Sequence, residues 1–254
     1  DLHFMRIQFT IDLLPSDITG VSVYNQDVRS FEFRPGAVFA NVVVGDEINR
    51  ASPKTQSALL EAMEEAQVTV DGTTYALPHP FMVMATQNPI EMEGTYPLPE
   101  AQRDRFLARI SMGYPPPHAE TDMLDTHSAD SPLDRLQPVT DAATISDLIL
   151  SVRRVHASLA IRQYIVDLAH ATRTSSALRL GASPRATLHL LRAARAHAAL
   201  KGRDHVLPDD VQHVLAEVWG HRVILSGEAH LARRSPEDVL DDLAHRTRVP
   251  GARR

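Results

Sequence analysis

The sequence predicts an α/β fold, a parallel sheet flanked by helices, followed by an all-helical second part. The apolar run Val38–Val44 is typical of a strand buried on both faces of a parallel sheet. Such runs alternate with helix-patterned and loop segments through the first half of the chain, which favours a parallel arrangement. From about Ser146 onward, almost every segment has helical periodicity instead.

The expected strands of the first part are short and separated by turns. In chain order they are Met5–Phe9, Val21–Val23, Phe31–Phe33, Val38–Val44, Phe81–Thr86 and, with a weaker pattern, Phe106–Ser111. The second and third are spaced to pair as a hairpin. The stretch "VTVDGTTYAL" predicts another hairpin around Asp71-Gly72.

One helix of the first part is marked clearly, in "ASPKTQSALLEAMEEAQ". Ser52 is its expected N-cap and Pro53 its first residue. The later stretch "GYPPPHAE" ends the α/β pattern, because three successive prolines fit neither a helix nor a central strand. We therefore expect a first domain at 1–112, a proline-rich linker at 113–143 and a helical domain at 144–254.

The helices of the last domain are separated by short loops that contain Gly or Pro. They are expected near 144–157, 161–177, 184–200 and 209–222. The last of them begins at "LPDDVQ" without a Ser or Thr at Leu207, the position of its cap.

Composition excludes several classes of protein. The 254 residues include no cysteine, which excludes disulfides and thiolate metal sites and is consistent with a cytoplasmic protein. No apolar run reaches the roughly 18 residues of a membrane span. Residues 1–150 carry 9 Lys and Arg against 22 Asp and Glu, whereas 151–254 carry 17 against 10. This reversal predicts two bodies with different surfaces. The arginines of the basic half are scattered and not interleaved with aromatic residues, which argues against nucleic-acid binding.

Two adjacent carboxylates end the apolar run Val38–Val44. A buried strand of a parallel sheet delivers its last residues to the carboxyl edge, where α/β proteins bind ligands. Asp46 and Glu47 therefore suit phosphoryl chemistry: one can hold Mg²⁺, and the other can orient and deprotonate a water molecule. A solvated acidic turn is the simpler alternative for this segment taken alone.

Other polar residues favour the phosphoryl interpretation. Asn88 follows the strand expected at Phe81–Thr86 and would reach the same edge, although an Asn before Pro is commonly a turn residue. Arg103 and Arg105 precede a further expected strand, and the arginine fork suits a phosphate. Arg185 lies in the first turn of a helix, where a cation opposes the helix dipole unless an anion is near.

Taken together, these segments resemble the MoxR-type AAA+ ATPases over nearly the whole chain. Their Walker B box looks like "VVVGDEINRA", sensor 1 like "ATQNP", the arginine-finger segment like "GTYPLPEAQRDRF" and sensor 2 like "GASPRA". The stretch "LLPSDITG" is also similar to a segment of that group. The resemblance implies an AAA+ sheet followed by a helical lid, hexameric rings with ATP at the subunit interfaces, and ATP hydrolysis with Mg²⁺. It also implies chaperone-like remodelling, maturation or metal insertion of partners, often proteins with von Willebrand factor A domains.

The resemblance also assigns roles to individual residues. Asp46 would bind Mg²⁺ beside the nucleotide, and Glu47 would be the catalytic base. Asn88 would orient the attacking water and the γ-phosphate. Arg105 would be the finger that reaches into the neighbouring subunit's site, and Arg185 the sensor on the lid.

The chain departs from the family pattern in a few places. It contains no G-x-x-x-x-G-K-[ST], the phosphate-binding loop that the family carries before the strand at Met5–Phe9. We therefore expect the N-terminal part of the AAA+ domain to be missing here and this stretch alone to be inactive. The alternative function is a non-hydrolysing module that binds partner proteins. Arg103 and Gly45 also depart from the pattern. Because of Arg103, the segment contains two candidates for the arginine finger, Arg103 and Arg105. A DNA helicase is disfavoured because the sequence shows no basic aromatic groove.

Overall fold

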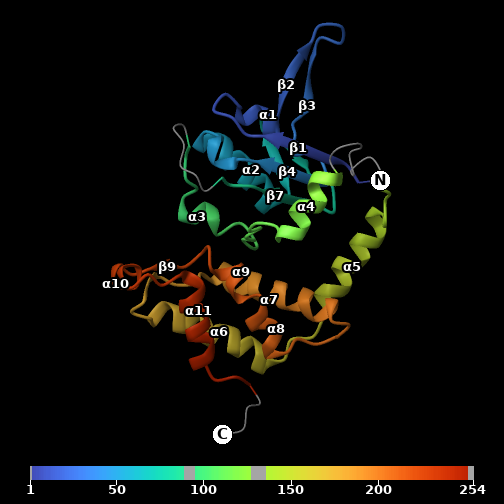
Figure 1. Ribbon diagram of the computed structural model, residues 1–254. Coiled ribbons are helices and arrows are strands. Elements are labelled where there is room, and N and C mark those ends of the chain that lie inside the picture. Colours follow the sequence, from blue (N-terminus) through green and yellow to red (C-terminus); the bar gives the residue numbers. More distant parts are fainter. Residues whose placement is uncertain (1, 89–94, 127–135, 251–254) are drawn as a thin grey trace.

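The computed structural model describes residues 2–88, 95–126 and 136–250. It has an upper α/β part, from β1 to α4, and a lower helical part, from α5 to α11 (Figure 1). The predicted fold class is confirmed: a parallel sheet flanked by helices is followed by a helical part.

The sheet that carries the carboxylate pair has three parallel strands in the order β1-β4-β7. Their bounds are Phe4–Gln8, Val42–Asp46 and Met82–Ala85. Because the strands are parallel, their carboxyl ends meet at one edge, where Gln8 is in register with Asp46 and Ala85 with Gly45. Helices α1 (Pro15–Thr19) and α2 (Pro53–Glu65) belong to the same part.

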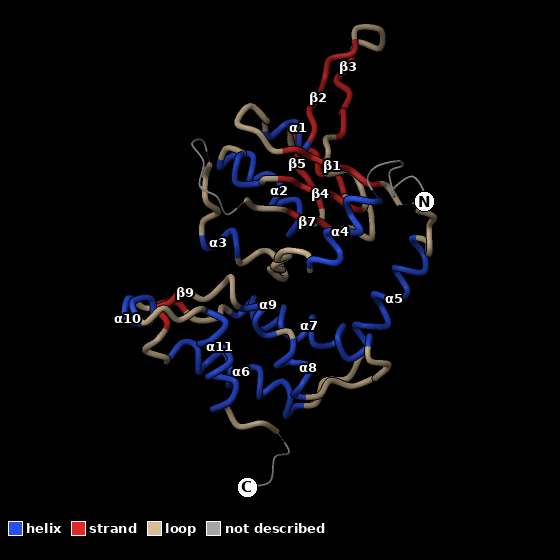
Figure 2. Tube along the Cα trace, viewed as in Figure 1, coloured by secondary structure: helices blue, strands red, loops and turns tan. Residues whose placement is uncertain are grey.

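The two predicted hairpins form. Strands β2 (Gly20–Asn25) and β3 (Ser30–Pro35) pair antiparallel and project from the top of the molecule (Figure 2). Strands β5 (Gln67–Val70) and β6 (Thr73–Ala76) pair around Asp71-Gly72. Both turn residues have positive φ, 50° and 78°, as a tight hairpin turn with the twist of its strands requires.

Two of the predicted strands are shorter or less buried than expected. The run from Val38 becomes a strand only at Val42, because the N–H groups of Ala37 and Val38 donate to α1 carbonyls instead of to a neighbouring strand. Strand β7 is not buried on both faces, since Met82 and Met84 are 51% and 46% exposed. An apolar run alone does not distinguish a sheet-paired segment from one packed against a helix.

The strand predicted at Phe106–Ser111 does not form. Its first two carbonyls, those of Phe106 and Leu107, accept hydrogen bonds from His221 and Arg222 of the helical part. Farther along, the N–H of Arg109 donates to a carbonyl of the same part. Groups that a strand would use in a ladder therefore join the α/β part to the helical part.

The remaining elements follow the α/β sheet. They are α3 (Glu100–Arg103), α4 (Pro117–Thr126), α5 (Ala142–Arg154), α6 (Leu159–Thr174), β8 (Leu178–Leu180), α7 (Pro184–Leu200), α8 (Pro208–His213), α9 (Leu215–Trp219), β9 (Ile224–Leu225), α10 (Gly227–Leu231) and α11 (Pro236–Arg246). The helix expected at 209–222 is two helices, because Val214 leaves helical geometry (φ −101°, ψ 3°). Within the expected linker, α4 is helical, and residues 127–135 lie outside the described chain.

Each part has a core of its own. In the α/β part, β4 and α2 bury residues such as Val43, Leu59 and Leu60. In the helical part, Tyr164 and Trp219 are the largest fully buried side chains. Over the described stretches of the chain, no helix combines the length and apolar character needed to cross a membrane.

Candidate ATPase site

The carboxylate pair lies at the carboxyl edge of the parallel sheet, as predicted from the sequence. Asp46 is the last residue of β4, and Glu47 follows it in left-handed backbone geometry (φ 57°, ψ 49°). Non-glycine residues rarely adopt this conformation, so it requires support from neighbouring groups. Thr86 provides it: its hydroxyl accepts from Glu47 N at 3.0 Å, and its carbonyl accepts from Ile48 N at 3.0 Å.

Strand β1 supplies a donor to each carboxylate. Arg6 Nε lies 2.7 Å from Asp46 Oδ2, and Gln8 Nε2 donates to Glu47 Oε2 at 3.1 Å. Arg50 Nη1 also lies 3.3 Å from Glu47 Oε2. The Asp46 and Glu47 side chains remain 20% and 31% exposed, so both are accessible to a ligand. Arg6 and Gln8 were not predicted as site residues, although their alternation with apolar residues in "FMRIQF" indicated that they share a face.

The residues after Glu47 are held by a buried amide. Gln56 of α2 is 0% exposed, and its Nε2 donates to the carbonyls of Ile48 (3.2 Å), Ala51 (3.2 Å) and Tyr96 (3.1 Å). Asn88 lies at the same edge, one strand away from Asp46, and its carbonyl accepts from Asn49 Nδ2 at 3.3 Å. The structure therefore brings Asp46, Glu47 and Asn88 to one edge.

The two arginines predicted to act on a phosphate meet at a second place. Glu64, near the end of α2, contacts both of them: Arg105 Nε lies 3.1 Å from its Oε2, and Arg185 Nη2 donates to its Oε1. All three side chains are partly exposed, from 33% to 37%. Glu64 supplies the anion that the first-turn position of Arg185 requires, and it was not predicted as a site residue.

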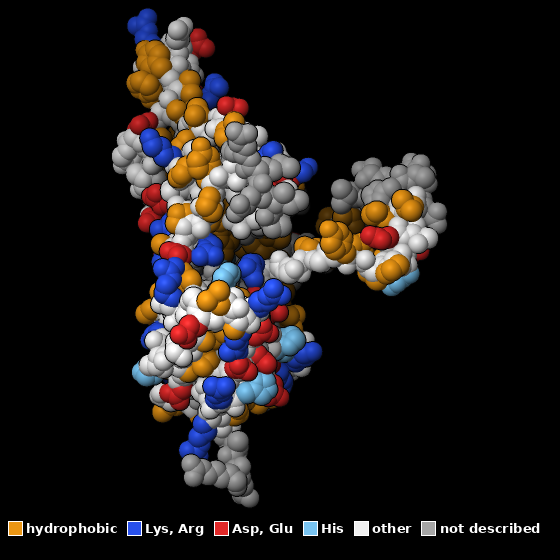
Figure 3. Space-filling view, turned by 60° about the vertical axis from the view of Figure 1, so that its left-hand side comes forward, with side chains coloured by type: hydrophobic (Ala, Val, Ile, Leu, Met, Phe, Trp, Pro, Cys, Tyr) orange, Lys and Arg blue, Asp and Glu red, His pale blue; other side chains and the backbone are white. Residues whose placement is uncertain are grey.

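Arg103 is directed to a different surface. It lines an open groove of about 480 Å³ that runs between α3 and the antiparallel pair of β8 and β9, together with Glu100 and Arg179. Arg179 Nη2 lies 3.5 Å from Glu100 Oε1 across this groove. The two rival finger residues thus face different neighbours, and Arg105 is the one that shares an anion with Arg185. Figure 3 shows Lys and Arg side chains gathered along the boundary between the two parts.

Comparisons with known proteins agree with this geometry. Residues 1–108 match the ATPase family associated with various cellular activities (AAA), and residues 170–252 match the AAA lid domain. The chain is 43% identical to Chaperone MoxR1 of Mycobacterium tuberculosis, over 97% of this chain and 67% of that protein. It is 35% identical to Protein MoxR of Paracoccus denitrificans, over 97% and 80%. The chain belongs to the MoxR-type AAA+ ATPases.

Two further relatives support this membership. The protein YeaC of Bacillus subtilis (strain 168), itself uncharacterized, is 49% identical over 97% of this chain and 77% of its own length. A crystal structure from Cytophaga hutchinsonii, named provisionally as an ATPase, superposes with a TM-score of 0.90 at 40% identity. It covers 98% of this chain and 78% of that one. Residues 170–252 of the helical part accordingly form the lid of a MoxR-type protein.

The MoxR-type site fits a magnesium ion in its chemistry. Asp46 offers a carboxylate, and the hydroxyl of Thr86 lies 3.3 Å from its Oδ1, so oxygen ligands of the kind that Mg²⁺ prefers are together. The described residues hold no cluster of three or more His, Asp or Glu side chains that could bind a metal by themselves.

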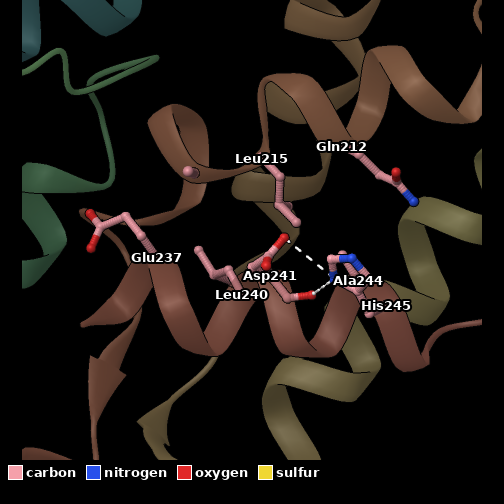
Figure 4. A pocket seen from close by; sticks show the side chains of 8 residues that line it. Gln212, Leu215, Glu237, Leu240, Asp241, Ala244 and His245 are labelled. Atoms are coloured by element: carbon pink, nitrogen blue, oxygen red, sulfur yellow. Dashed lines mark hydrogen bonds and ion pairs between the residues drawn. The ribbon is translucent and has the colours of Figure 1, made fainter. Parts of the chain in front are cut away.

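A pocket on the lid does not serve as the nucleotide site. It has a volume of about 70 Å³ and lies between the α8–α9 pair and α11, lined in part by Leu215, Leu240 and Ala244 (Figure 4). Its polar groups are already engaged, since His245 Nδ1 donates to the Asp241 carbonyl at 2.8 Å. Sites for ligands of this size enclose roughly 300–1,000 Å³.

Proposed function

We propose that this MoxR-type protein is a subunit of an ATP-hydrolysing hexameric ring, with ATP bound at the subunit interfaces. The observation that carries the proposal is the supported pair Asp46 and Glu47 at the sheet edge. Thr86 fixes the backbone of Glu47, and Gln8 holds one oxygen of its carboxylate. These contacts hold the Glu47 carboxylate at a fixed place beside Asp46, which is what a base that orients water requires.

Each residue at the edge has a distinct role in the proposed reaction. Asp46 holds Mg²⁺, which when bound neutralises charge on the phosphates. Glu47 orients a water molecule and accepts its proton as the water attacks the γ-phosphate. Asn88 donates to the water or to the γ-phosphate. Arg6 lies against Asp46, and the binding of Mg²⁺ would require Arg6 to yield part of that contact.

We place the arginine pair at the neighbouring subunit's nucleotide. Arg105 and Arg185 share Glu64, which supports a role for both at one phosphate. Glu64 is the anion that such a phosphate would replace. An arginine supplied by a neighbouring subunit stabilises the charge that develops during phosphoryl transfer, by roughly 10³–10⁵ in rate in other systems.

The biological role that we propose is chaperone-like remodelling of partner proteins in the cytoplasm, including maturation or metal insertion. One relative is named Chaperone MoxR1, which supports this class of activity. Proteins with von Willebrand factor A domains are the partners that we propose, from the resemblance to the MoxR group.

The base is tested with Glu47→Gln in the full-length natural protein. The amide keeps the size of the side chain but cannot take a proton from water, so ATP binding should persist while turnover falls about 10²–10⁴-fold. The rate of ATP hydrolysis is measured from the release of phosphate. ATP binding is measured by calorimetry. Hydrolysis at the wild-type rate would exclude Glu47 as the base. Failure of the unaltered protein to hydrolyse ATP would favour a non-hydrolysing binding module.

The location of the finger is tested by mixing variants. Arg105→Ala should lose hydrolysis as Glu47→Gln does, but because of a defect at the neighbouring site. Mixed rings should regain partial turnover, since some interfaces combine an intact Glu47 with an intact Arg105 from the next subunit. Arg103→Ala is the control. Rescue that follows Arg103 would move the finger by two residues, and no rescue with either variant would refute a site shared between subunits.

A further inference from the structure

Arg222, in the turn between α9 and β9, is a buried guanidinium whose contacts cross from the lid to the α/β part. Its side chain is 1% exposed. Nη2 donates to the carbonyls of Asp104 (3.1 Å) and Phe106, and Nη1 donates to that of Leu107 at 3.3 Å. Nε lies 3.0 Å from Asp104 Oδ1, a contact between charges rather than a directed hydrogen bond.

These contacts satisfy a segment that has no strand neighbour. Without Arg222, the carbonyls of Asp104, Phe106 and Leu107 would lose these partners at a partly buried place, which costs free energy where water cannot replace them. His221 assists by donating to Phe106 O at 3.2 Å. Burial lowers the pKa of Arg222, and the charge of Asp104 opposes that effect. A buried charge is tolerated when it is paired and hydrogen-bonded in this way.

The same carboxylate also fixes the start of α7. Ser183 Oγ donates to Asp104, 3.0 Å from each carboxylate oxygen, and accepts from the backbone of α7 as its N-cap. Arg105 follows Asp104 in the chain, and Arg185 lies two residues after Ser183. Asp104 therefore sets the spacing of the two arginines that meet at Glu64.

Arg222 is in turn fixed relative to α7. Trp219, in the preceding helix, is fully buried, and its Nε1 donates to Ala186 O at 2.9 Å. Arg222 also donates to Val218 O and to His189 Nδ1 of α7. The guanidinium is thus held by two lid helices on one side and by 104–107 on the other.

From this arrangement we infer that Arg222 is a positioning residue: it clamps 104–107 to the lid so that Arg105 and Arg185 are presented as one unit. The inference rests on the proposed role of the two arginines in phosphate binding. The clamp itself is a statement about geometry, and it can be tested without nucleotide.

Lysine cannot replace Arg222 in this role. An ammonium keeps the charge, but its donors all lie on one nitrogen. It therefore cannot reach all the carbonyls that the separate nitrogens of the planar guanidinium contact. Arg109 offers a matched control, because it also crosses between the two parts. Its Nη2 lies 2.7 Å from Glu237 Oε1, but the two side chains are 60% and 40% exposed, so Arg109→Lys should change little.

The absence of cysteine makes distance measurement by spin labelling direct. Lys54→Cys on α2 and Leu200→Cys on α7 place labels at exposed positions of the two parts. Double electron–electron resonance should give one narrow distance distribution for the labelled parent. Arg222→Lys should at least double its width, whereas Arg109→Lys should leave it unchanged. An unchanged width in a folded Arg222→Lys variant, checked by Trp219 fluorescence, would overturn the clamp.

If Arg222→Lys does not fold, the variant Asp104→Asn tests the clamp instead. The amide keeps the shape of the side chain but loses the charge that faces Arg222, so the distribution should broaden here too, and an unchanged width would again overturn the clamp. In the full-length protein, Arg222→Lys should lower kcat about 10²-fold with little change in KM for ATP, because misplacement of a transition-state contact does not weaken ground-state binding. A normal kcat in a variant with broadened distances would show that the clamp exists and that the proposed role of the arginines is wrong.

Discussion

Asp210 carries a negative charge inside the lid and is 1% exposed. Its Oδ1 accepts from Arg203 Nη2 (2.5 Å) and lies 2.7 Å from His197 Nδ1. Its Oδ2 accepts from Arg203 Nη1 (2.7 Å) and from Leu207 N (2.7 Å). In the last of these bonds the side chain of Asp210, in the first turn of α8, accepts from the backbone of the N-cap residue Leu207. The carboxylate therefore joins α7, α8 and the loop between them.

The substitution Asp210→Asn tests how much this cluster contributes to the stability of the lid. Either orientation of the amide turns its NH₂ toward one of the two Arg203 donors, so at least one hydrogen bond is lost along with the charge. Removing one partner of a buried pair costs about 3–5 kcal/mol. Arg203 is 25% exposed and can regain water, which places the expected loss near the lower end, at about 3 kcal/mol.

Trp219 provides the assay. It is the single tryptophan of the chain and is fully buried in the lid, so its fluorescence reports unfolding of the lid in urea. With a slope of about 2 kcal/mol per molar, the midpoint should fall by about 1.5 M. Asp209→Asn, one residue away and exposed, is the control and should change stability by less than about 1 kcal/mol. Equal midpoints for the two variants would refute the reasoning.

The effect should also depend on pH. Burial by itself would raise the pKa of Asp210, but hydrogen bonds from Arg203, Leu207 and His197 outweigh it and lower that pKa. A group whose pKa is lowered on folding contributes stability above its unfolded value, about 3.9, and loses that contribution as the pH falls through the folded value. The difference between wild type and Asp210→Asn should therefore shrink below about pH 4.

Two further predictions concern packing and acid stability. In Gly45→Ala the new Cβ would lie 2.7 Å from Cε2 of the buried Phe9, so the variant should lose about 1–3 kcal/mol in urea unfolding followed by circular dichroism. Gly227→Ala, which meets no atom within 4 Å, is its control, and equal losses would contradict the packing argument. Burial and a neighbouring guanidinium lower the pKa of His189 and of His221 to about 4. As the pH falls, the unfolded chain protonates these histidines from about pH 6.5, whereas the folded chain does so only near pH 4. The free energy of unfolding should therefore decrease between pH 6.5 and 4, by up to about 3 kcal/mol for His221 alone. A free energy of unfolding that is constant over that range would argue against buried neutral imidazoles.

The sequence by itself determined those features that depend only on residues close together in the chain. Ser52 and Pro53 start α2, because a cap needs only the side chain and the N–H three residues on. The Asp71-Gly72 turn sets the β5–β6 hairpin in the same local way. The adjacency of Asp46 and Glu47 after an apolar run was enough to place both at the edge of a parallel sheet, which the structure confirms.

Tertiary structure alone decided how distant side chains meet. Arg105 and Arg185 are eighty residues apart in the chain and converge on Glu64, which no feature of the sequence had singled out. The segment after Asp104 has the apolar pattern of a strand, yet its carbonyls bond to Arg222, more than one hundred residues away. Periodicity records which side of a segment is buried, not which partner satisfies its backbone. That partner depends on where the lid docks, because only docking brings the guanidinium and the carbonyls together.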